Sequence, residues 1–414
     1  MNRKLARLLA SLMVGNLAPG VSAAANDSQV VASASTCLRS AAWSQLDGAR
    51  PRPASVGSVL AGMAKRDVVL LGERHDFADD HRWQLQTLAA LHAQRPQMAI
   101  GFEMFPRRVQ PVLDRWVAGE LTVRQFLELS EWDKVWALPA ELYLPLFEFA
   151  RINRIPMLAL DVDQKFSQAI AEKGWDALPV AEREGVSRPA PPAGAYRDFL
   201  RAVYRQHPTM TNRDGAKAKL NAHGDKQSDD RGFADFVESQ TARDRAMAEA
   251  LAHRATPGAE GEKPLLVGIM GNGHVRFGWG VPHQLHDLGV KNVGILMAVA
   301  ADTDCDNVRA GLADAVFALP KQATPPEEPP RLGVRLEGGD GGNVRIAEII
   351  AGSLAEKSGL KGGDQLLEIA GEPTKRMTQV VAAVRRQPGG TWLPIRVRRG
   401  DETLDLVVKF PVQP

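Results

Sequence analysis

Short apolar runs that end abruptly in acidic residues or histidines recur along the chain. Such runs, bounded by polar residues, are typical of strands buried in a parallel sheet. The first run, residues 68–71, leads into Glu73 and His75. The later runs carry comparable residues at the same end: Glu103 in 97–105, Asp161 and Asp163 in 156–163, and His274 in 265–274.

Helical spacing separates these apolar runs. Residues 81–94, 142–152 and 233–255 place apolar side chains at three- and four-residue intervals. This alternation predicts an α/β fold with an open, mostly parallel sheet flanked by helices. Since the carboxyl ends of parallel strands meet at one edge of a sheet, the acids and histidines should share a cleft. Arg243 falls on the buried face of the last helix, so we expect the cleft carboxylates to be its partners.

The pattern changes twice further along the chain. A Pro-rich spacer at 319–330 is followed by short alternating strands and Gly-rich turns over 331–414. A chain of 414 residues is too long for one ordinary core, which also favours two domains. We therefore predict a signal peptide at 1–25 and an entry segment at 26–60, with a short helix near 37–46. An α/β domain should follow at 61–318, with a polar insertion or lid at 180–232. The linker at 319–330 then leads to a second domain at 331–414.

Composition and the N-terminal residues narrow the class of protein. A hydrophobic content of 44%, a charged content of 24% and a net charge of +2 describe a globular protein with no signal for a nucleic-acid partner. The basic, apolar and small residues of 1–25 are typical of a secretory signal peptide, and no run is long enough for a transmembrane span. We expect a periplasmic or secreted protein. Its two cysteines, Cys37 and Cys305, would then form a disulfide rather than remain free buried thiols.

The candidate chemistry lies at the expected cleft. Glu73, His75, Glu103 and His274 offer two imidazoles and two carboxylates, a set suited to a divalent metal ion or to a general base with an orienting carboxylate. Arg243 could stabilise an oxyanion or the carboxylate pair. Alternatively, these groups satisfy one another as a buried network without catalytic function.

The chain resembles two known families. Residues 37–318 resemble the ChaN-like haem-binding uptake family of the Tiki superfamily, which also includes erythromycin-esterase-like branches. The resemblance rests on 71–76 with His81, on 102–107, on 130–132 with Trp136 and Tyr143, on 239–244 with Met247, and on 271–274 with Gly280 and Pro282. The tail resembles a PDZ domain, a small β-sandwich-like fold, through its 332–334 turn, Gly363–Asp364 and Gly371.

These resemblances imply ligands and partners. The first implies haem binding linked to iron uptake, with Tyr143 and His81 as candidate haem-binding residues. A metal- or His/Glu-dependent hydrolase is the alternative. The second implies that Leu332, Gly333 and Val334 bind the C-terminal carboxylate of a peptide or protein. The chain departs from the pattern of the first family in two ways: no lipid-attachment signal is visible, and Asp161 stands where relatives often have Asn. A homodimer is a further possible partner arrangement.

Overall fold

A computed structural model describes residues 37–136, 138–206, 226–255, 263–320, 330–338 and 343–412. The expected signal peptide, residues 207–225 of the expected insertion, and residues 321–329 of the expected linker lie outside the described residues. Within the described part of the chain, no helix combines the length and the apolar character needed to cross a membrane.

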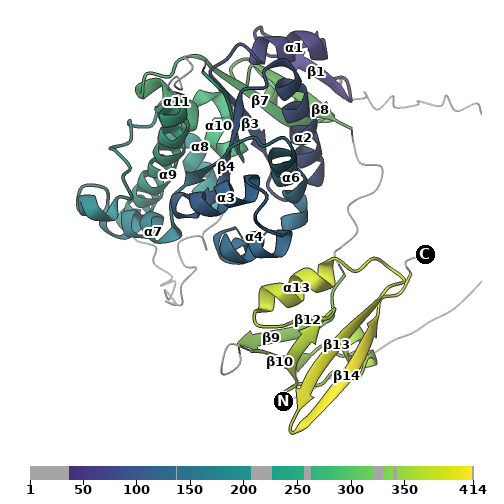
Figure 1. Cartoon of the computed structure of the whole chain (residues 1–414). Coiled ribbons are helices and arrows are strands. Elements are labelled where there is room, and N and C mark those ends of the chain that lie inside the picture. The colour runs from purple at the N-terminus through teal and green to yellow at the C-terminus, as the bar shows by residue number, and fades with distance from the viewer. Residues whose placement is uncertain are drawn as a thin grey trace, which may run out of the picture. The chain divides into compact units, whose positions relative to one another are not determined.

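An eight-stranded sheet forms the centre of the larger unit (Figure 1). Its strand order is β2-β1-β8-β7-β3-β6-β4-β5. The strands from β3 to β8 pair in parallel, whereas β1 and β2 pair antiparallel at one side. This confirms the open, mostly parallel sheet. The strands are β1 Ala42–Gln45, β2 Arg52–Ala54, β3 Val68–Glu73, β4 Met98–Pro106, β5 Met157–Asp161, β6 Leu265–Gly271, β7 Val293–Ala300 and β8 Ala315–Leu319.

Helices cover both faces of this sheet because its central strands are apolar on both sides. In β3, Val69 and Leu71 belong to one core, and Val68 and Leu70 to the other. The first core includes residues of α1 Val56–Met63, α2 Ala78–Gln94, α3 Gln110–Val117, α4 Val123–Leu129, α5 Trp132–Val135 and α6 Leu144–Ile152. The second includes residues of α9 Lys226–Arg254, α10 Asn272–Val275 and α11 Val281–Asp287. Two further helices are α7 Gln164–Lys173 and α8 Gly194–Gln206.

The helix expected near residues 37–46 is wrong, because these residues contain β1. Trp43 of β1 lies opposite Ala54 of β2 and Phe317 of β8. Its ring packs edge-on against Phe317, with the centroids 5.4 Å apart, and tilted against Trp83 at 5.9 Å. Pairing with the adjacent β2 on one side and with the distant β8 on the other outweighs the weak helical preference of a short segment.

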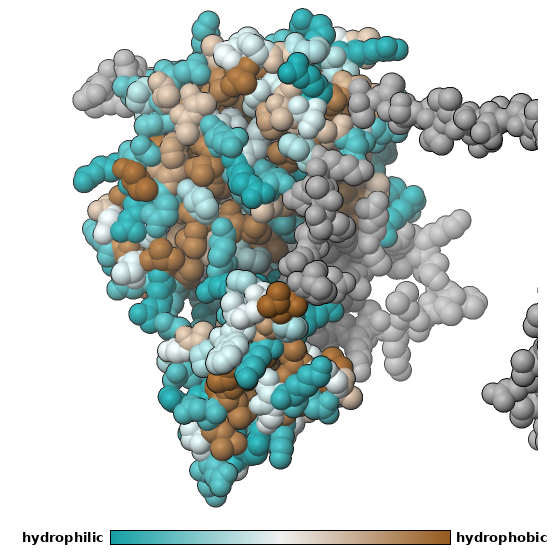
Figure 2. Space-filling view, turned by 90° about the vertical axis from the view of Figure 1, so that its right-hand side faces the viewer, coloured by the Kyte–Doolittle hydropathy of each residue, from teal (hydrophilic) through white to brown (hydrophobic). Residues whose placement is uncertain are grey.

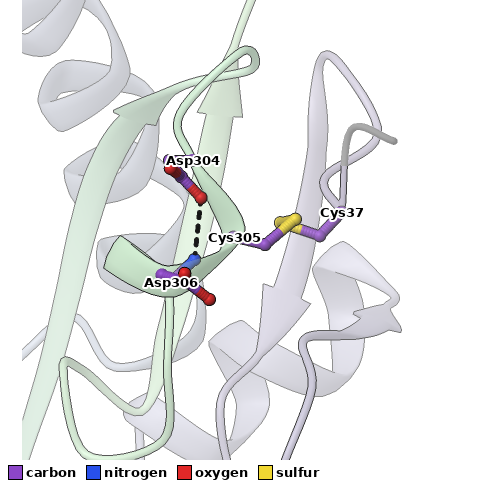
Figure 3. The surroundings of a disulfide bond; sticks show 4 residues. All are labelled: Cys37, Asp304, Cys305 and Asp306. Atoms are coloured by element: carbon purple, nitrogen blue, oxygen red, sulfur yellow. Dashed lines mark hydrogen bonds between the residues drawn. A yellow bond between two sulfur atoms is a disulfide. The ribbon is translucent and has the colours of Figure 1, made fainter. Parts of the chain in front are cut away.

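A disulfide ties the residues before β1 to the segment after β7. Cys37 and Cys305 are bonded across a sequence separation of 268 residues, with their Cα atoms 5.6 Å apart (Figure 3). The predicted pairing of the two cysteines is therefore confirmed. The short 3₁₀ turn that carries Cys305 is capped by Asp304, whose side chain accepts a hydrogen bond from the Asp306 backbone N–H at 3.1 Å.

The C-terminal residues form an antiparallel sheet with its own core. The order is β14-β13-β11-β10-β9, with β12 beside β11. Leu393, Ile395 and Val397 alternate inward along β13, as expected of a sheet with one solvated face. Its elements are β9 Val334–Gly338, β10 Val344–Ile349, α12 Leu354–Lys357, β11 Gln365–Ile369, β12 Glu372–Pro373, α13 Met377–Arg385, β13 Trp392–Arg399 and β14 Glu402–Lys409.

The surface shown in Figure 2 mixes hydrophobic with hydrophilic residues. Isolated apolar side chains on a surface are ordinary for a folded protein and do not by themselves identify a binding site. Buried polar residues gather instead at the carboxyl edge of the large sheet.

Candidate functional site

Three neighbouring strands bring the predicted residues together at the carboxyl edge of the sheet. Glu73 ends β3 and lies opposite Gly271 of β6, and β4 carries Glu103 on the other side of β6. The Gly271 backbone N–H donates to Glu103 Oε2 at 2.7 Å. His274 Nε2 lies 3.3 Å from Glu103 Oε1. The structure thus places Glu73, His75, Glu103 and His274 in one cluster.

Two glycines allow the strand ends to approach one another so closely. A Cβ atom on Gly72 would lie 2.5 Å from Asn272 Oδ1 and 2.8 Å from Val275 Cγ2. A Cβ atom on Gly271 would lie 2.8 Å from the ring of His75. Residues 72–75 and 271–274 share the spacing Gly-x-x-His. These two turns fit into each other, since His75 of the first lies against the glycine of the second.

Arg243 joins the carboxylates of two strands. Its Nη2 atom donates to Glu103 Oε1 at 2.8 Å and to Asp161 Oδ2 at 2.5 Å. The prediction that cleft carboxylates partner this arginine is confirmed. Burial would raise the pKa of Glu103, but the charge and hydrogen bond of His274, followed by the charges of Arg243 and His75, hold it well below its usual range. Glu103 is therefore ionised at neutral pH.

His274 is held between two carboxylates. Its Nδ1 atom lies 2.6 Å from Asp244 Oδ1, opposite the contact of its Nε2 atom with Glu103. Burial would lower the pKa of His274, but Glu103 and Asp244 outweigh burial and raise it to about 10. This raised pKa favours the imidazolium form of His274 at neutral pH.

Sequence reasoning missed Asp244 and Tyr196. Asp244 is fully buried and also accepts a hydrogen bond from the hydroxyl of Tyr196 at 2.8 Å. A signal for Asp244 was present, because it stands seven residues from both Val237 and Leu251 and so lies within the apolar stripe of α9. Nothing in the pattern around Tyr196, which follows a Pro-rich loop, singles it out.

His75 differs from the other members of the cluster in being accessible. Its side chain is 37% exposed, whereas that of Glu73 is completely buried. Its Nδ1 atom lies 2.8 Å from Glu73 Oε1, and its ring packs edge-on against Trp136 at 4.9 Å. No described residue forms a hydrogen bond with its Nε2 atom. Burial would lower the pKa of His75, but the hydrogen bond with Glu73 and the charges of Glu103 and Glu73 raise it overall.

Tyr143 and His81 hold Glu73 in place. The fully buried hydroxyl of Tyr143 donates to Glu73 Oε1 at 2.7 Å, and burial next to that carboxylate raises the pKa of the hydroxyl. His81 is 4% exposed, with Nε2 lying 3.1 Å from the carbonyl oxygen of His75 and Nδ1 lying 3.2 Å from Gln84 Oε1. Both predicted haem-binding residues therefore face other members of the network.

The cluster is divided into two pairs rather than arranged around a common centre. Within the described residues, no group of three or more His, Cys, Asp or Glu side chains is placed to hold a metal ion. The physical reason is that each carboxylate already has cationic or hydroxyl partners: Tyr143 and His75 at Glu73, and Arg243 and His274 at Glu103.

A cavity of about 460 Å³ lies beside these pairs. It is bordered by Glu103, Asp161 and Arg243 of the cluster, and by Trp136, which packs on His75. Its other lining residues include apolar side chains and cations: Met104, Pro106, Val135, Val162, Arg108, Lys134 and Lys165.

The predicted peptide-binding turn has the backbone geometry that such a turn needs. Gly333 adopts a φ of +77°, and a Cβ atom there would overlap the side chain of Ser353. The carbonyl groups of Leu332 and Gly333 accept hydrogen bonds from the N–H groups of Ala355 and Ile350, both at 2.9 Å. Their own N–H groups donate to no described residue. The turn leads directly into β9, which is an edge strand.

Comparisons with known proteins agree with this architecture. Residues 59–285, more than half of the chain, match the model of the family described as haem-binding uptake, Tiki superfamily, ChaN. Residues 345–399 match the PDZ domain model. A protein of Ralstonia nicotianae named as a candidate zinc metalloprotease is 38% identical over 58 residues, which are 14% of this chain and 12% of that relative.

Two solved structures are also similar. One is described as cofacial haem binding to ChaN of Campylobacter jejuni, with a TM-score of 0.47 and 18% identity, covering 64% of this chain and 92% of that one. The other is the HtrA3 PDZ domain bound to a phage-derived ligand, with a TM-score of 0.18 and 19% identity, covering 19% of this chain and 82% of that domain.

Proposed function

This chain belongs to the ChaN haem-binding uptake family of the Tiki superfamily and contains a PDZ domain, and we propose that it binds haem, which His75 would hold through its Nε2 atom. The observation that carries this proposal is the environment of the His75 ring. Its Nδ1 atom is held by the buried Glu73, while its Nε2 atom has no partner among the described residues. Histidines that ligate metals in proteins typically have such a carboxylate on the other ring nitrogen.

The surroundings of His75 also suit haem. Haem supplies an iron that takes an imidazole nitrogen, a flat apolar ring system and two propionate carboxylates. Trp136 packs on His75 and lines the adjoining cavity, which also presents Lys165 as a cation for a carboxylate. Arg108 lines the cavity too, but it is already paired with Glu131 and Asp163. Tyr143 is a weaker candidate for the ligand, because a tyrosinate would have to form next to the carboxylate of Glu73.

A haem titration followed by visible absorption tests this assignment. We expect a saturable shift of the Soret band for the wild type, loss of that shift in His75→Ala, and about 10- to 100-fold weaker binding in Glu73→Gln. His286→Ala, which removes an exposed histidine elsewhere on the unit, should bind like the wild type. A shift that survives in His75→Ala but is lost in Tyr143→Phe would contradict the assignment.

The Glu73–His75 pair also favours a second candidate function, that of a hydrolase. An accessible imidazole whose other nitrogen is held by a buried carboxylate is also the arrangement of a general base. A screen of ester, amide and phosphoester substrates with the haem-free protein would support this function if turnover is lost in His75→Ala. Absence of turnover together with a Soret shift would leave haem binding.

We further propose that the PDZ domain binds the free C-terminus of a protein partner along β9. The N–H groups of Leu332 and Gly333, which donate to no residue in the described part of the chain, suit a carboxylate, and the edge strand β9 can accept an added strand beside α13. Exposed apolar residues of α13, Met377 and Val381, suit an apolar peptide side chain.

Fluorescence polarisation with a labelled peptide that ends in valine tests the PDZ proposal. We expect saturable binding by the full chain and at least about tenfold weaker binding when the same peptide is amidated at its C-terminus. The amidated peptide changes the ligand and leaves the protein intact, so misfolding cannot explain a loss. Equal affinity for the two peptides would exclude carboxylate recognition.

Export is the remaining part of the proposed function. The Cys37–Cys305 disulfide supports it, because structural disulfides persist chiefly in oxidising compartments. Fractionation of cells that produce the full chain should recover the protein outside the cytoplasm. Recovery in the cytoplasm, with both thiols reduced, would contradict this proposal.

A further inference from the structure

Two arginines, neither of which has a carboxylate partner among the described residues, meet at the ring of Phe277. The guanidinium carbon of Arg276 lies 4.8 Å from the ring centroid of Phe199 and 5.7 Å from that of Phe277. The guanidinium carbon of Arg309 lies 5.1 Å from the centroid of Phe277. Neither arginine forms an ion pair with any described residue. The pair is therefore a concentration of positive charge without a counterion.

The surroundings of Arg276 make this charge unfavourable in the free protein. Its Nε atom is buried and has no hydrogen-bond partner. Burial, and then the positive charge of Arg309, lower the pKa of Arg276. A buried donor without an acceptor and two neighbouring like charges both destabilise a fold. An anion bound to the accessible guanidinium N–H groups would relieve the repulsion between the two like charges.

Other half-buried arginines have hydrogen-bonding partners, which are carboxylates for Arg243 and Arg245 and backbone carbonyls for Arg95 and Arg183. Arg243 contacts Glu103 and Asp161, and Arg245 contacts Asp287 and Glu249. The absence of such a partner at Arg276 is thus a local feature of this cluster.

A partly exposed aromatic surface adjoins the two arginines. Phe277 stacks on Trp279 with the centroids 4.6 Å apart, and Trp279 lies 5.9 Å from Phe199. Phe277 has a φ of +55°, a conformation that a bulky residue adopts at a cost. Its backbone N–H donates to the carbonyl of Leu312 at 3.0 Å, which helps to fix the ring in this position.

We propose that Arg276 and Arg309 bind the phosphate or carboxylate group of a small molecule whose flat apolar part rests on Phe199 and Trp279. Guanidinium groups bind such oxyanions through paired N–H donors, and aromatic rings accept a flat group by stacking. This site is distinct from the Glu73–His75 pair and does not depend on haem binding, since neither arginine contacts that pair.

Isothermal titration calorimetry at constant ionic strength, with phenyl phosphate and with benzoate as probes, tests the site. We expect saturable heat from at least one probe and about tenfold or greater loss of affinity in both Arg276→Gln and Arg309→Gln. Tighter binding of phenyl phosphate identifies a phosphate ligand, and tighter binding of benzoate identifies a carboxylate. Inorganic phosphate should bind more weakly than phenyl phosphate, because it lacks the stacking group.

A matched control separates this site from non-specific attraction. Arg50 is an exposed arginine of the same unit, and Arg50→Gln should leave both affinities unchanged. Arg309 is also exposed, so Arg309→Gln should fold normally, which circular dichroism can verify. No saturable heat from either probe, or an equal loss in Arg50→Gln, would overturn the proposal.

Discussion

At the scale of single residues, charge pairing decides the properties of the buried cluster. The two histidines of the Gly-x-x-His turns have the same sequence context but different environments. His274 is enclosed by Glu103 and Asp244, whereas His75 has one carboxylate and an exposed edge. The first is a permanent cation near neutral pH, and the second retains a free ring nitrogen.

This difference predicts how stability depends on pH. The pKa of His274 is about 10 in the folded protein against 6.5 ordinarily. The protonated His274 therefore contributes its full share of the free energy of unfolding below about pH 6.5. This contribution is lost as the pH rises towards 10, and the free energy of unfolding falls by up to about 1.4 kcal/mol per pH unit. Urea unfolding at several pH values should show that the difference in the free energy of unfolding between the wild type and His274→Gln shrinks across this range. His286→Gln serves as the control, and wild-type and His274→Gln curves that stay parallel from pH 6 to 10 would refute the assignment.

At the scale of elements, the approach of β3 to α10 depends on a glycine. The side chains of Asn272 and Val275 occupy the space next to the Cα atom of Gly72. The strand therefore positions Glu73 and His75 only if the residue before Glu73 has no side chain.

Two alanine substitutions test this dependence. Gly72→Ala should destabilise the protein by about 1–3 kcal/mol, because the added methyl group overlaps Asn272 and Val275. In Gly62→Ala the methyl group meets no atom within 4 Å, and α1 should gain about 0.5–1 kcal/mol from the loss of a helix-interior glycine. The denaturant midpoint should fall in Gly72→Ala and rise in Gly62→Ala. Similar effects of the two substitutions would show that the close approach is not limiting.

At the scale of the whole molecule, the disulfide closes a very long loop. Disulfides typically contribute about 2–4 kcal/mol to the free energy of unfolding, whereas the chain-entropy model gives a loop this long more than about 4.7 kcal/mol, with a gain that grows only slowly with loop length. It joins the residues before β1 to those after β7 and thus holds the antiparallel side of the sheet to the rest.

Cys37→Ser should therefore lower the free energy of unfolding by about 2–4 kcal/mol. Cys305→Ser should cost the same, and the double variant should cost no more than either single one, because all three remove one bond. Unfolding measured without reductant would test this, with the reduced wild type as a further reference. Additive losses would mean that each cysteine contributes mainly through its own packing.

The sequence by itself determined the sheet, the disulfide pairing and the residues at the strand ends. Short continuous apolar runs and helical spacing predict the strands and helices, because the burial of apolar side chains is a local pattern repeated along the chain. The partner of Arg243 could also be predicted, since a buried guanidinium requires a carboxylate.

The tertiary structure decided what those residues do. It divided the predicted quartet into two pairs, left His75 accessible, and turned Tyr143 and His81 towards Glu73. It also formed β1 where a helix was expected. These outcomes depend on distances between groups that are far apart in the sequence, and a one-dimensional pattern carries no such distances.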